Sequence, residues 1–197
     1  LFNPNFVPLS YNKLYSTYRP LFNSWVSLCF LVHFFLFCSR TIVFTSELKR
    51  AQETAKIILQ NLDQWNFLNN EGKIISNINL NERDYGDLTG LNKKETAEKF
   101  GEEQVHKWRR GYSDQPPNGE SLEDVVRRVT KYFEEVIKPA IQSDENGNIL
   151  IAAHGNSLRA LLIVMNIYEP NNINSVELST GVPIHVILKD NKFSIKD

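Results

Sequence analysis

A histidine directly after an apolar run is the feature of this sequence with the clearest chemical meaning. The run 149–153 ends at His154, which is followed by Gly155, Asn156 and Ser157. The run has the length and composition of a strand buried on both faces. Gly155 lets the backbone approach a ligand closely, and Asn156 or Ser157 can cap a helix whose free N–H groups face the same point. The pattern predicts that a sheet presents one imidazole to a phosphate, although a structural histidine at a strand end would look the same.

Three further clusters of charged residues supply groups that such a site would need. They are Arg50, the loop 82–85 that begins with Glu82, and the pair Arg109 and Arg110. Guanidinium groups bind phosphate oxygens through paired hydrogen bonds, and Glu82 could move a proton to or from a sugar-like hydroxyl. Together with His154, these clusters predict an anion site that contains an acid.

Each of these residues also has a purely structural interpretation. Arg109 and Arg110 are typical of a solvated helix end, where arginine interacts with free carbonyl groups. Arg50 could pair with a glutamate of its own helix, and a Glu82–Arg83 surface pair would contribute little to stability. Lys93, at a predicted helix start, is a weak candidate for the anion site, whereas His106 and His185 are interpreted as structural histidines.

Strands and helices alternate along the chain in an order that would bring these clusters together. Short apolar runs predict strands, and apolar residues at helical spacing predict helices. The predicted elements of the first half are a strand at 41–44, a helix after residue 45 or 46 and a weaker strand at 74–80. A capping box of Asn92 and Glu95 then predicts the start of a helix that runs toward Trp108. The later elements are a helix from Ser121, a strand at 149–153, a helix at 158–165, a strand at 183–188 and an edge strand through 193–195. This order predicts an α/β fold with a mainly parallel sheet and helices on both faces. Ligands bind beyond the carboxyl ends of such strands, where the polar clusters fall.

Length and composition indicate one globular domain. The chain has 197 residues, of which 42% are hydrophobic and 23% charged, which suits one well-buried core. The formal net charge of −1 argues against nucleic acid as a partner, since domains that bind it are usually strongly basic. The two cysteines, Cys29 and Cys38, belong to no Cys/His cluster. The sequence therefore predicts neither a metal site nor a disulfide framework, and a reducing compartment such as the cytoplasm is expected.

Residues 1–40 differ from the rest of the chain. They contain no Asp or Glu, and residues 26–38 are almost wholly apolar. That run is shorter than the roughly 18 residues that span a bilayer. It could be the apolar part of a signal peptide, a buried strand, or sequence foreign to the domain, but residues 39–41 make a poor cleavage site. We expect an apolar N-terminal segment at 1–40, a domain at 41–197, and no association with membranes.

Eight stretches of the sequence carry a resemblance to a known family. They are residues 45–51, 80–88, 90–93, 101–105, 108–110, 119–122, 153–159 and 180–183. Through them, the chain from Thr41 to about Leu188 resembles the cofactor-dependent phosphoglycerate mutases of the histidine phosphatase superfamily. The resemblance implies the fold of those mutases, an α/β fold with a mainly parallel sheet, with the first strand of the family absent or substituted.

The resemblance also implies a role for each candidate residue. The phosphates and the carboxylate of a phosphoglycerate would be held by Arg50, Lys93, Arg109 and Arg110. The pocket would be lined by Glu82, Arg83, Asp84 and Tyr85, and completed by Gly155 and Asn156. Glu82 would donate and accept the proton of the substrate hydroxyl, and His154 would stabilise the phosphoryl group in transit.

The activity that the resemblance implies is an isomerase of glycolysis and gluconeogenesis. The family interconverts 3-phosphoglycerate and 2-phosphoglycerate through a phosphohistidine that 2,3-bisphosphoglycerate primes, and it needs no metal. The implied partners are these small molecules, and the resemblance leaves open whether copies of the chain form a homo-oligomer.

One motif of the family is missing. Its nucleophile is a different histidine, in an Arg-His-Gly motif at the end of the first strand, and this sequence contains no such tripeptide. His33 lies in an apolar run, but only residues 38–40 separate that run from the strand at Thr41. A parallel neighbour needs a crossover of a dozen or more residues.

We therefore expect that residues 1–40 stand in place of the first strand, its helix and the nucleophile, through a frameshift, a wrong start or a gene fragment. Loss of a central strand would leave backbone groups unpaired and apolar faces uncovered. The chain as written is then expected to be inactive as a mutase, and poorly stable unless residues 26–38 fill the gap.

Three alternatives to the mutase interpretation remain. The chain could be a broader phosphatase of the same superfamily. It could be a non-catalytic protein that binds phosphorylated acids through Arg109, Arg110 and His154. It could also be attached to a membrane by residues 26–38.

Overall fold

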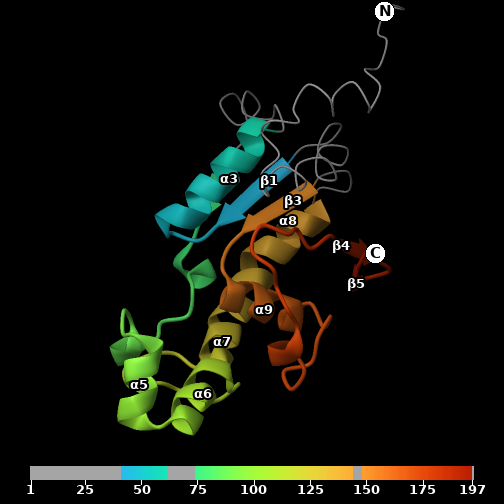
Figure 1. Cartoon of the computed structure of the whole chain (residues 1–197). Helices are drawn as coiled ribbons and strands as arrows, with labels where there is room; N and C mark the ends of the chain where they lie inside the picture. Colours follow the sequence, from blue (N-terminus) through green and yellow to red (C-terminus); the bar gives the residue numbers. More distant parts are fainter. Residues whose placement is uncertain (1–40, 62–73, 144–147, 197) are drawn as a thin grey trace, which may run out of the picture.

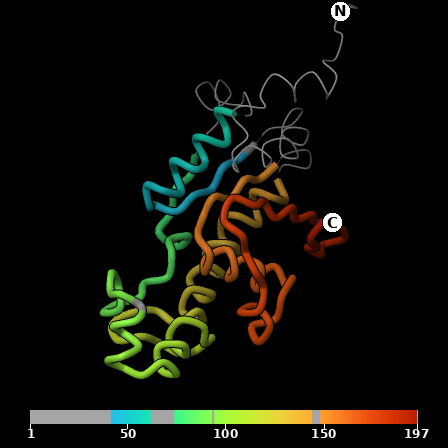
Figure 2. Tube along the Cα trace, in the orientation of Figure 1, coloured from blue at the N-terminus to red at the C-terminus, as the bar shows by residue number. Residues whose placement is uncertain are grey.

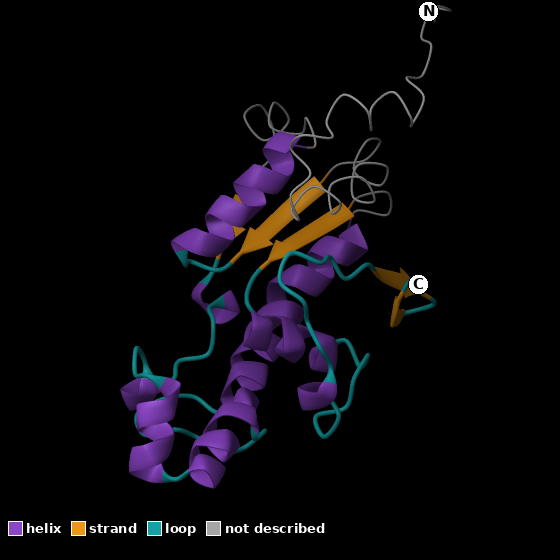
Figure 3. Cartoon of the chain, viewed as in Figure 1, coloured by secondary structure: helices purple, strands orange, loops and turns teal. Residues whose placement is uncertain are grey.

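A three-stranded parallel sheet lies between helices in the part of the chain that the structure describes, residues 41–61, 74–143 and 148–196 (Figure 1). The structure is a computed structural model. The strands are β1 (Thr41–Thr45), β2 (Ile74–Ser76) and β3 (Asn148–Ala152), in the order β2-β1-β3. The predicted α/β class with a parallel sheet flanked by helices is confirmed (Figure 3). The expectations for residues 1–40 lie outside the described residues.

The strand register makes the three strands end at the same level. Thr45, the last residue of β1, is in register with Ser76 of β2 and with Ala152 of β3. Figure 2 shows the blue trace of β1 beside the orange trace of β3, although the two strands are far apart in the sequence. Whatever follows each strand is therefore delivered to one edge of the sheet.

Two of the predicted strands need correction. The strand predicted at 74–80 ends at Ser76, because the Asn77 side chain accepts a hydrogen bond from the Asn79 N–H at 2.9 Å and starts the 3-10 turn η2 (Ile78–Leu80). The prediction that the 149–153 run is buried on both faces is also wrong. β3 is half-buried except at Ala152, because β3 pairs only with β1 among the described strands.

Alternate residues of the sheet face two separate helical layers. On one face Val43 and Ala152 pack with Ala55 and Leu59 of α3 (Lys49–Asn61). On the other face Phe44 enters a larger core with α7 (Leu122–Tyr132) and α9 (Gly155–Val164). The larger of these buried side chains, Val43, Phe44 and Leu59, each contribute about 1.5–3 kcal/mol on burial and hold the sheet between the layers.

The helix predicted from Ser121 is the long helical segment of the second layer. The Ser121 side chain accepts a hydrogen bond from the Asp124 N–H, and the Asp124 carboxylate accepts one from the Ser121 N–H. After α7 the segment continues as a π-helical turn η4 (Phe133–Ile137) and then as α8 (Lys138–Ser143). Proline at position 139 has no N–H to donate, which favours a change in the hydrogen-bonding pattern near this point.

The helix predicted from Asn92 toward Trp108 is two helices. They are α5 (Lys93–Phe100) and α6 (Glu102–Arg110), and they lie together at one end of the molecule, away from the sheet (Figure 1). Gly101 separates them with a φ of 85°, which residues other than glycine rarely adopt. The Asn92 side chain caps α5 by accepting a hydrogen bond from the Lys94 N–H, but within the described part of the chain Glu95 returns no bond to Asn92, so the predicted capping box is not formed.

The last part of the chain forms a small separate sheet. After the 3-10 turn η5 (Ile173–Ser175), β4 (Val186–Lys189) and β5 (Lys192–Ile195) pair as an antiparallel hairpin. Asp190 and Asn191 turn it with φ values of 51° and 59°. The predicted turn at Asp190 and Asn191 and the strand through 193–195 are thus confirmed, whereas the strand predicted at 183–188 begins only at Val186. In the part of the chain that the structure describes, no helix has the length and apolar character needed to cross a bilayer.

Candidate active site

The residues that follow the three parallel strands meet at the carboxyl edge of the sheet. Ser46 follows β1, the segment 77–85 follows β2, and His154 follows β3. His154 is 8% exposed and Ser46 is fully buried. Crossovers that include α3 and α5 to α8 return the chain to the start of the next parallel strand, so each strand ends at this edge and residues from distant parts of the sequence meet there.

Both ring nitrogens of His154 have a hydrogen-bond partner. Arg50, in the first turn of α3, donates from Nε to His154 Nδ1 at 3.2 Å, and Ser46 Oγ lies 2.7 Å from His154 Nε2. Because Nδ1 accepts, the proton of the neutral imidazole is on Nε2 and is donated to Ser46 Oγ. Ser46 is therefore an acceptor that orients the ring, rather than a hydroxyl that the histidine activates.

Burial and neighbouring cations favour the neutral form of His154. Burial lowers the pKa of His154, the positive charges of Arg50 and Arg128 lower it further, and the carboxylate of Glu82 acts in the opposite direction. An uncharged imidazole beside a guanidinium leaves the site with a net positive potential, which suits an anion.

The first turn of α9 begins at His154 rather than at residue 158. His154 is the N-cap of this helix, and its N–H donates to Ser157 Oγ at 3.0 Å. The prediction that Asn156 or Ser157 is the cap is therefore wrong by two or three residues. The helix begins earlier because the Ser157 hydroxyl accepts the N–H of the cap residue His154, and the Asn156 side chain contacts Glu82 and Tyr85 instead of capping the helix.

Glu82 and Asn156 are joined directly. Asn156 donates from Nδ2 to Glu82 Oε1 at 2.9 Å and to the Tyr85 hydroxyl at 3.3 Å. Glu82 Oε1 also accepts the N–H of Arg83 at 2.7 Å. Among the described residues Glu82 Oε2 has no hydrogen-bond partner, and this oxygen lies 3.9 Å from where a Cβ at Gly155 would stand. Glu82 thus has one oxygen fixed and one oxygen facing the first turn of α9.

Two guanidinium groups flank the Tyr85 ring. That of Arg83 lies 4.6 Å from the ring centroid and that of Arg109 lies 5.5 Å from it. Arg83 is only 3% exposed and donates from Nη2 to the Arg109 carbonyl at 3.0 Å. Its Nε is buried without a hydrogen-bond partner in the described part of the protein. A buried cation with an unused donor is what an anion site requires before its ligand arrives.

Three other candidate residues are placed differently. The exposed Asp84 accepts the N–H of Gly86 at 2.8 Å, so its carboxylate turns into its own loop. Arg110 is exposed at the end of α6, and its carbonyl accepts from the Asn174 side chain. Lys93 is the first residue of α5, and its side chain lies outside the described residues.

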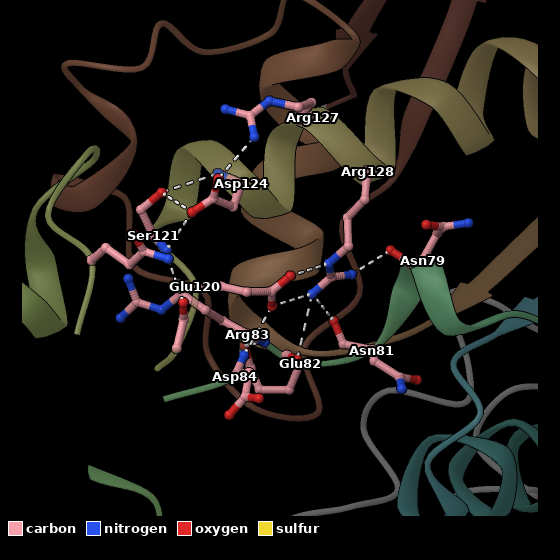
Figure 4. A network of polar contacts seen from close by, with 12 residues as sticks. Asn79, Asn81, Glu82, Arg83, Asp84, Glu120, Ser121, Asp124, Arg127 and Arg128 are labelled. Atoms are coloured by element: carbon pink, nitrogen blue, oxygen red, sulfur yellow. Dashed lines mark hydrogen bonds and ion pairs between the residues drawn. The ribbon is translucent and has the colours of Figure 1, made fainter. Parts of the chain in front are cut away.

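A half-buried clamp that the sequence analysis did not identify holds the Glu82 segment (Figure 4). Arg128 of α7 donates to both oxygens of the Glu120 carboxylate, at 2.8 and 3.0 Å. It also donates to the carbonyls of Asn79 at 2.6 Å and Asn81 at 3.0 Å. Glu120 Oε2 in turn accepts the N–H of Asp84 at 3.0 Å. We call the Arg128–Glu120 pair the loop clamp, because it fixes the backbone on both sides of Glu82.

Among residues 41–61, 74–143 and 148–196, the structure contains no group of three or more His, Cys, Asp or Glu residues that could hold a metal ion.

Comparison with known proteins gives matches over most of the chain. Residues 37–197 match the histidine phosphatase superfamily (branch 1). The chain is 49% identical over 148 residues to a 2,3-bisphosphoglycerate-dependent phosphoglycerate mutase of Methylocella silvestris, covering 75% of this chain and 68% of that protein. It is 47% identical over 148 residues to the protein of the same name from Methylorubrum extorquens, covering 75% of this chain and 66% of that protein. The chain thus spans about two thirds of the length of these relatives.

Solved structures with the same fold are more distant in sequence. The α-ribazole phosphatase of Shigella flexneri superposes with a TM-score of 0.65 at 18% identity, over 87% of this chain and 79% of that one. A mycobacterial glucosyl-3-phosphoglycerate phosphatase superposes with a TM-score of 0.60 at 18% identity, over 79% of this chain and 75% of that one. At such identity, the likeness shows the fold alone.

Proposed function

The chain belongs to the histidine phosphatase superfamily, and on that premise we propose that its site binds phosphoglycerates and is built for interconverting 3-phosphoglycerate and 2-phosphoglycerate. The observation that carries the proposal is the contact of His154 Nδ1 with Arg50, beside a glutamate whose Oε2 has no hydrogen-bond partner among the described residues. Phosphoryl binding needs cations and donors, and movement of the phosphoryl group between two hydroxyls needs a proton acceptor next to it.

The roles follow from the contacts. Arg50 and the His154 ring would hold the phosphoryl group, because an arriving anion can take the Nε–H that Arg50 now donates to Nδ1. Once Arg50 is neutralised by the anion, Nδ1 can be protonated and can itself donate to a phosphate oxygen. Glu82, held through Oε1 by Asn156, would take and return the proton of the substrate hydroxyl through Oε2.

The residues present also suit 2,3-bisphosphoglycerate as the priming cofactor. A ligand with two phosphates and a carboxylate needs more cations than one phosphate does, and the buried Arg83 Nε still has a donor to give. The open backbone at Gly155 allows close approach to the first turn of α9. Arg50, Arg83, Arg109 and Asn156 would hold this molecule, which supplies the phosphoryl group for priming when bound.

Turnover would also require a histidine that accepts the phosphoryl group. The printed sequence has four histidines and no Arg-His-Gly tripeptide. Of the described ones, His106 is exposed on α6 and His185 precedes β4. We therefore propose that the chain as printed binds phosphoglycerates without forming a phosphohistidine. A cytoplasmic location goes with this proposal, since its ligands are metabolites of glycolysis.

Calorimetric titration of the full chain tests the binding proposal. We expect 3-phosphoglycerate to bind, and Arg50→Gln to weaken that binding about 10-fold or more, because a charge-assisted contact to the phosphoryl group is lost. The matched control is Arg127→Gln, since Arg127 has a side chain that is 74% exposed and pairs only with Asp124 in the contacts above. Absence of binding by the unmodified chain would refute the proposal.

A second measurement tests the proposal on turnover. The full chain is incubated with 2,3-bisphosphoglycerate and examined for phosphohistidine by mass spectrometry under alkaline conditions, alongside a coupled assay of 2-phosphoglycerate formation. We expect binding but neither a phosphohistidine nor turnover. Either product would show that another histidine accepts the phosphoryl group, and the chain would then be a working mutase.

A further inference from the structure

Arg159 of α9 lies beside the site, and no role assigned above uses it. Its Nη2 donates to the Val176 carbonyl at 3.2 Å, which fixes one end of the guanidinium against the segment that follows η5. Its Nε is buried and has no hydrogen-bond partner among the described residues. A guanidinium has five N–H donors, and the contacts found for Arg159 use one of them.

The guanidinium of Arg159 faces the same space as the Glu82 carboxylate. A Cβ built on Gly155 would stand 3.3 Å from Arg159 Nη1 and 3.9 Å from Glu82 Oε2. Those two atoms are therefore close to one point above the first turn of α9, and only the absence of a side chain at Gly155 leaves that point open. A ligand whose hydroxyl reaches Glu82 Oε2 also comes within reach of Arg159.

The charges around Arg159 favour an anionic group at this point. Burial lowers the pKa of Arg159, the positive charges of Arg110 and Arg83 lower it further, and Glu82 and Tyr85 act in the opposite direction. The same segment that binds Arg159 through Val176 also binds Arg110, because Asn174 donates to the Arg110 carbonyl. The 173–176 segment thus contacts the Arg159 guanidinium and the Arg110 backbone, and the positive charge around Arg159 favours an anionic ligand.

We propose that Arg159 is a specificity-determining residue that binds the carboxylate of a phosphorylated hydroxy acid. The inference rests on the proposed function and deepens it. In 3-phosphoglycerate the free hydroxyl is on the carbon next to the carboxylate. A cation that shares an open point with Glu82 is therefore placed to bind the carboxylate while Glu82 meets the hydroxyl.

Comparing two ligands of nearly equal size tests this assignment. Glycerol 3-phosphate has the phosphate and hydroxyl of 3-phosphoglycerate but no carboxylate, and both are titrated into the full chain, Arg159→Gln, Arg159→Lys and the control Arg127→Gln. For Arg159→Gln we expect an affinity for 3-phosphoglycerate lower by about 10-fold or more, and an affinity for glycerol 3-phosphate changed by less than about threefold. Arg159→Lys, which keeps the charge but loses the planar fork, should fall between. Arg127→Gln should change neither.

The outcomes separate this inference from the proposed function. If Arg159→Gln weakens both ligands equally, Arg159 only supports the 173–176 segment, and the inference is wrong. If it weakens neither, the inference is also wrong, whereas the proposed function stands as long as the unmodified chain binds 3-phosphoglycerate. If the unmodified chain binds neither ligand, both fail together.

A measurement without substitution covers the case in which Arg159→Gln does not fold. The Nε–H resonance of Arg159 is followed by ¹⁵N NMR in the unmodified chain during each titration. We expect it to shift with 3-phosphoglycerate and to stay in place with glycerol 3-phosphate. Equal shifts with both ligands would overturn the assignment.

Discussion

Removing the arginine of the loop clamp should destabilise the protein and loosen the segment that carries Glu82. In Arg128→Met, the side chain keeps much of its length and loses all its donors. Four hydrogen bonds of 2.6–3.0 Å are lost, two to Glu120 and one each to the carbonyls of Asn79 and Asn81. A fifth contact, to the Glu82 carbonyl, is 3.5 Å long and contributes little.

The magnitude follows from these contacts and their exposure. Hydrogen bonds to charged groups contribute about 1.5–3 kcal/mol each, but contacts of one side chain are not additive. The side chains of Arg128 and Glu120 are 19% and 27% exposed, so water can replace part of what is lost. We therefore expect a loss of about 3 kcal/mol in the free energy of unfolding, which corresponds to a fall in Tm of about 6–12 °C for a chain of this size.

Urea unfolding followed by circular dichroism measures the effect, and calorimetry with 3-phosphoglycerate measures its consequence for the site. Arg127→Met is the matched control, because Arg127 is the neighbouring arginine of α7 and its side chain is 74% exposed. It should change the free energy of unfolding by less than about 0.5 kcal/mol. If Arg128→Met changes it no more than this control, the clamp does not hold the fold, and the reasoning from its geometry is refuted.

Three other predictions test separate features. Burial and Arg50 lower the pKa of His154 in the folded state, so the unfolded chain binds the proton more readily. The free energy of unfolding, measured with urea, should therefore fall as the pH drops below about 6.5, and His154→Asn should remove this pH dependence. Equal pH dependence in both proteins would contradict this. Gly86→Ala should lower the free energy of unfolding by about 3 kcal/mol, since the φ of Gly86 is 53° and the new Cβ would lie 2.1 Å from the Pro117 carbonyl oxygen. At Gly90 a new Cβ would have no atom within 4 Å, so Gly90→Ala should lower it by only about 1 kcal/mol. Ser121→Ala should lower the free energy of unfolding by about 1 kcal/mol through loss of the α7 cap, and an unchanged Tm would argue against that role.

Local patterns in the sequence were sufficient for the elements whose neighbours in the sequence determine them. The strand at β1 and the helix from Ser121 are such cases, because an apolar run or a capping residue is visible within a few positions. The failures came where one side chain decided the outcome. Asn77 ended β2 early by capping the next turn, and Gly101 divided one predicted helix into two. Both residue types suit several conformations, so their effect depends on the surrounding structure.

The site shows the same division. His154, Glu82 and Arg50 could be selected because their types and positions after strands have a chemical meaning. Arg128 could not be selected, since its partners Asn79 and Asn81 are 49 and 47 residues away and Arg127-Arg128 in a helix suggests an exposed pair. A single sequence carries no signal for which of two adjacent arginines faces the interior.

The parallel pairing of β1 with β3 also bears on the order in which the molecule folds. Ser46 and His154 are 108 positions apart, and no shorter segment brings them together. Closing a loop of that length costs about 4 kcal/mol of chain entropy, and this entropy is lost before the strand contacts contribute any stabilising energy. The α7 capping box and the hairpin β4–β5, by contrast, join residues that are near neighbours in the chain. Because the paired residues of β1 and β3 are far apart in the sequence, we expect their pairing to be a slow step of folding. The imidazole would therefore acquire its hydroxyl partner late in folding, and that single hydrogen bond would report on completion of the native topology.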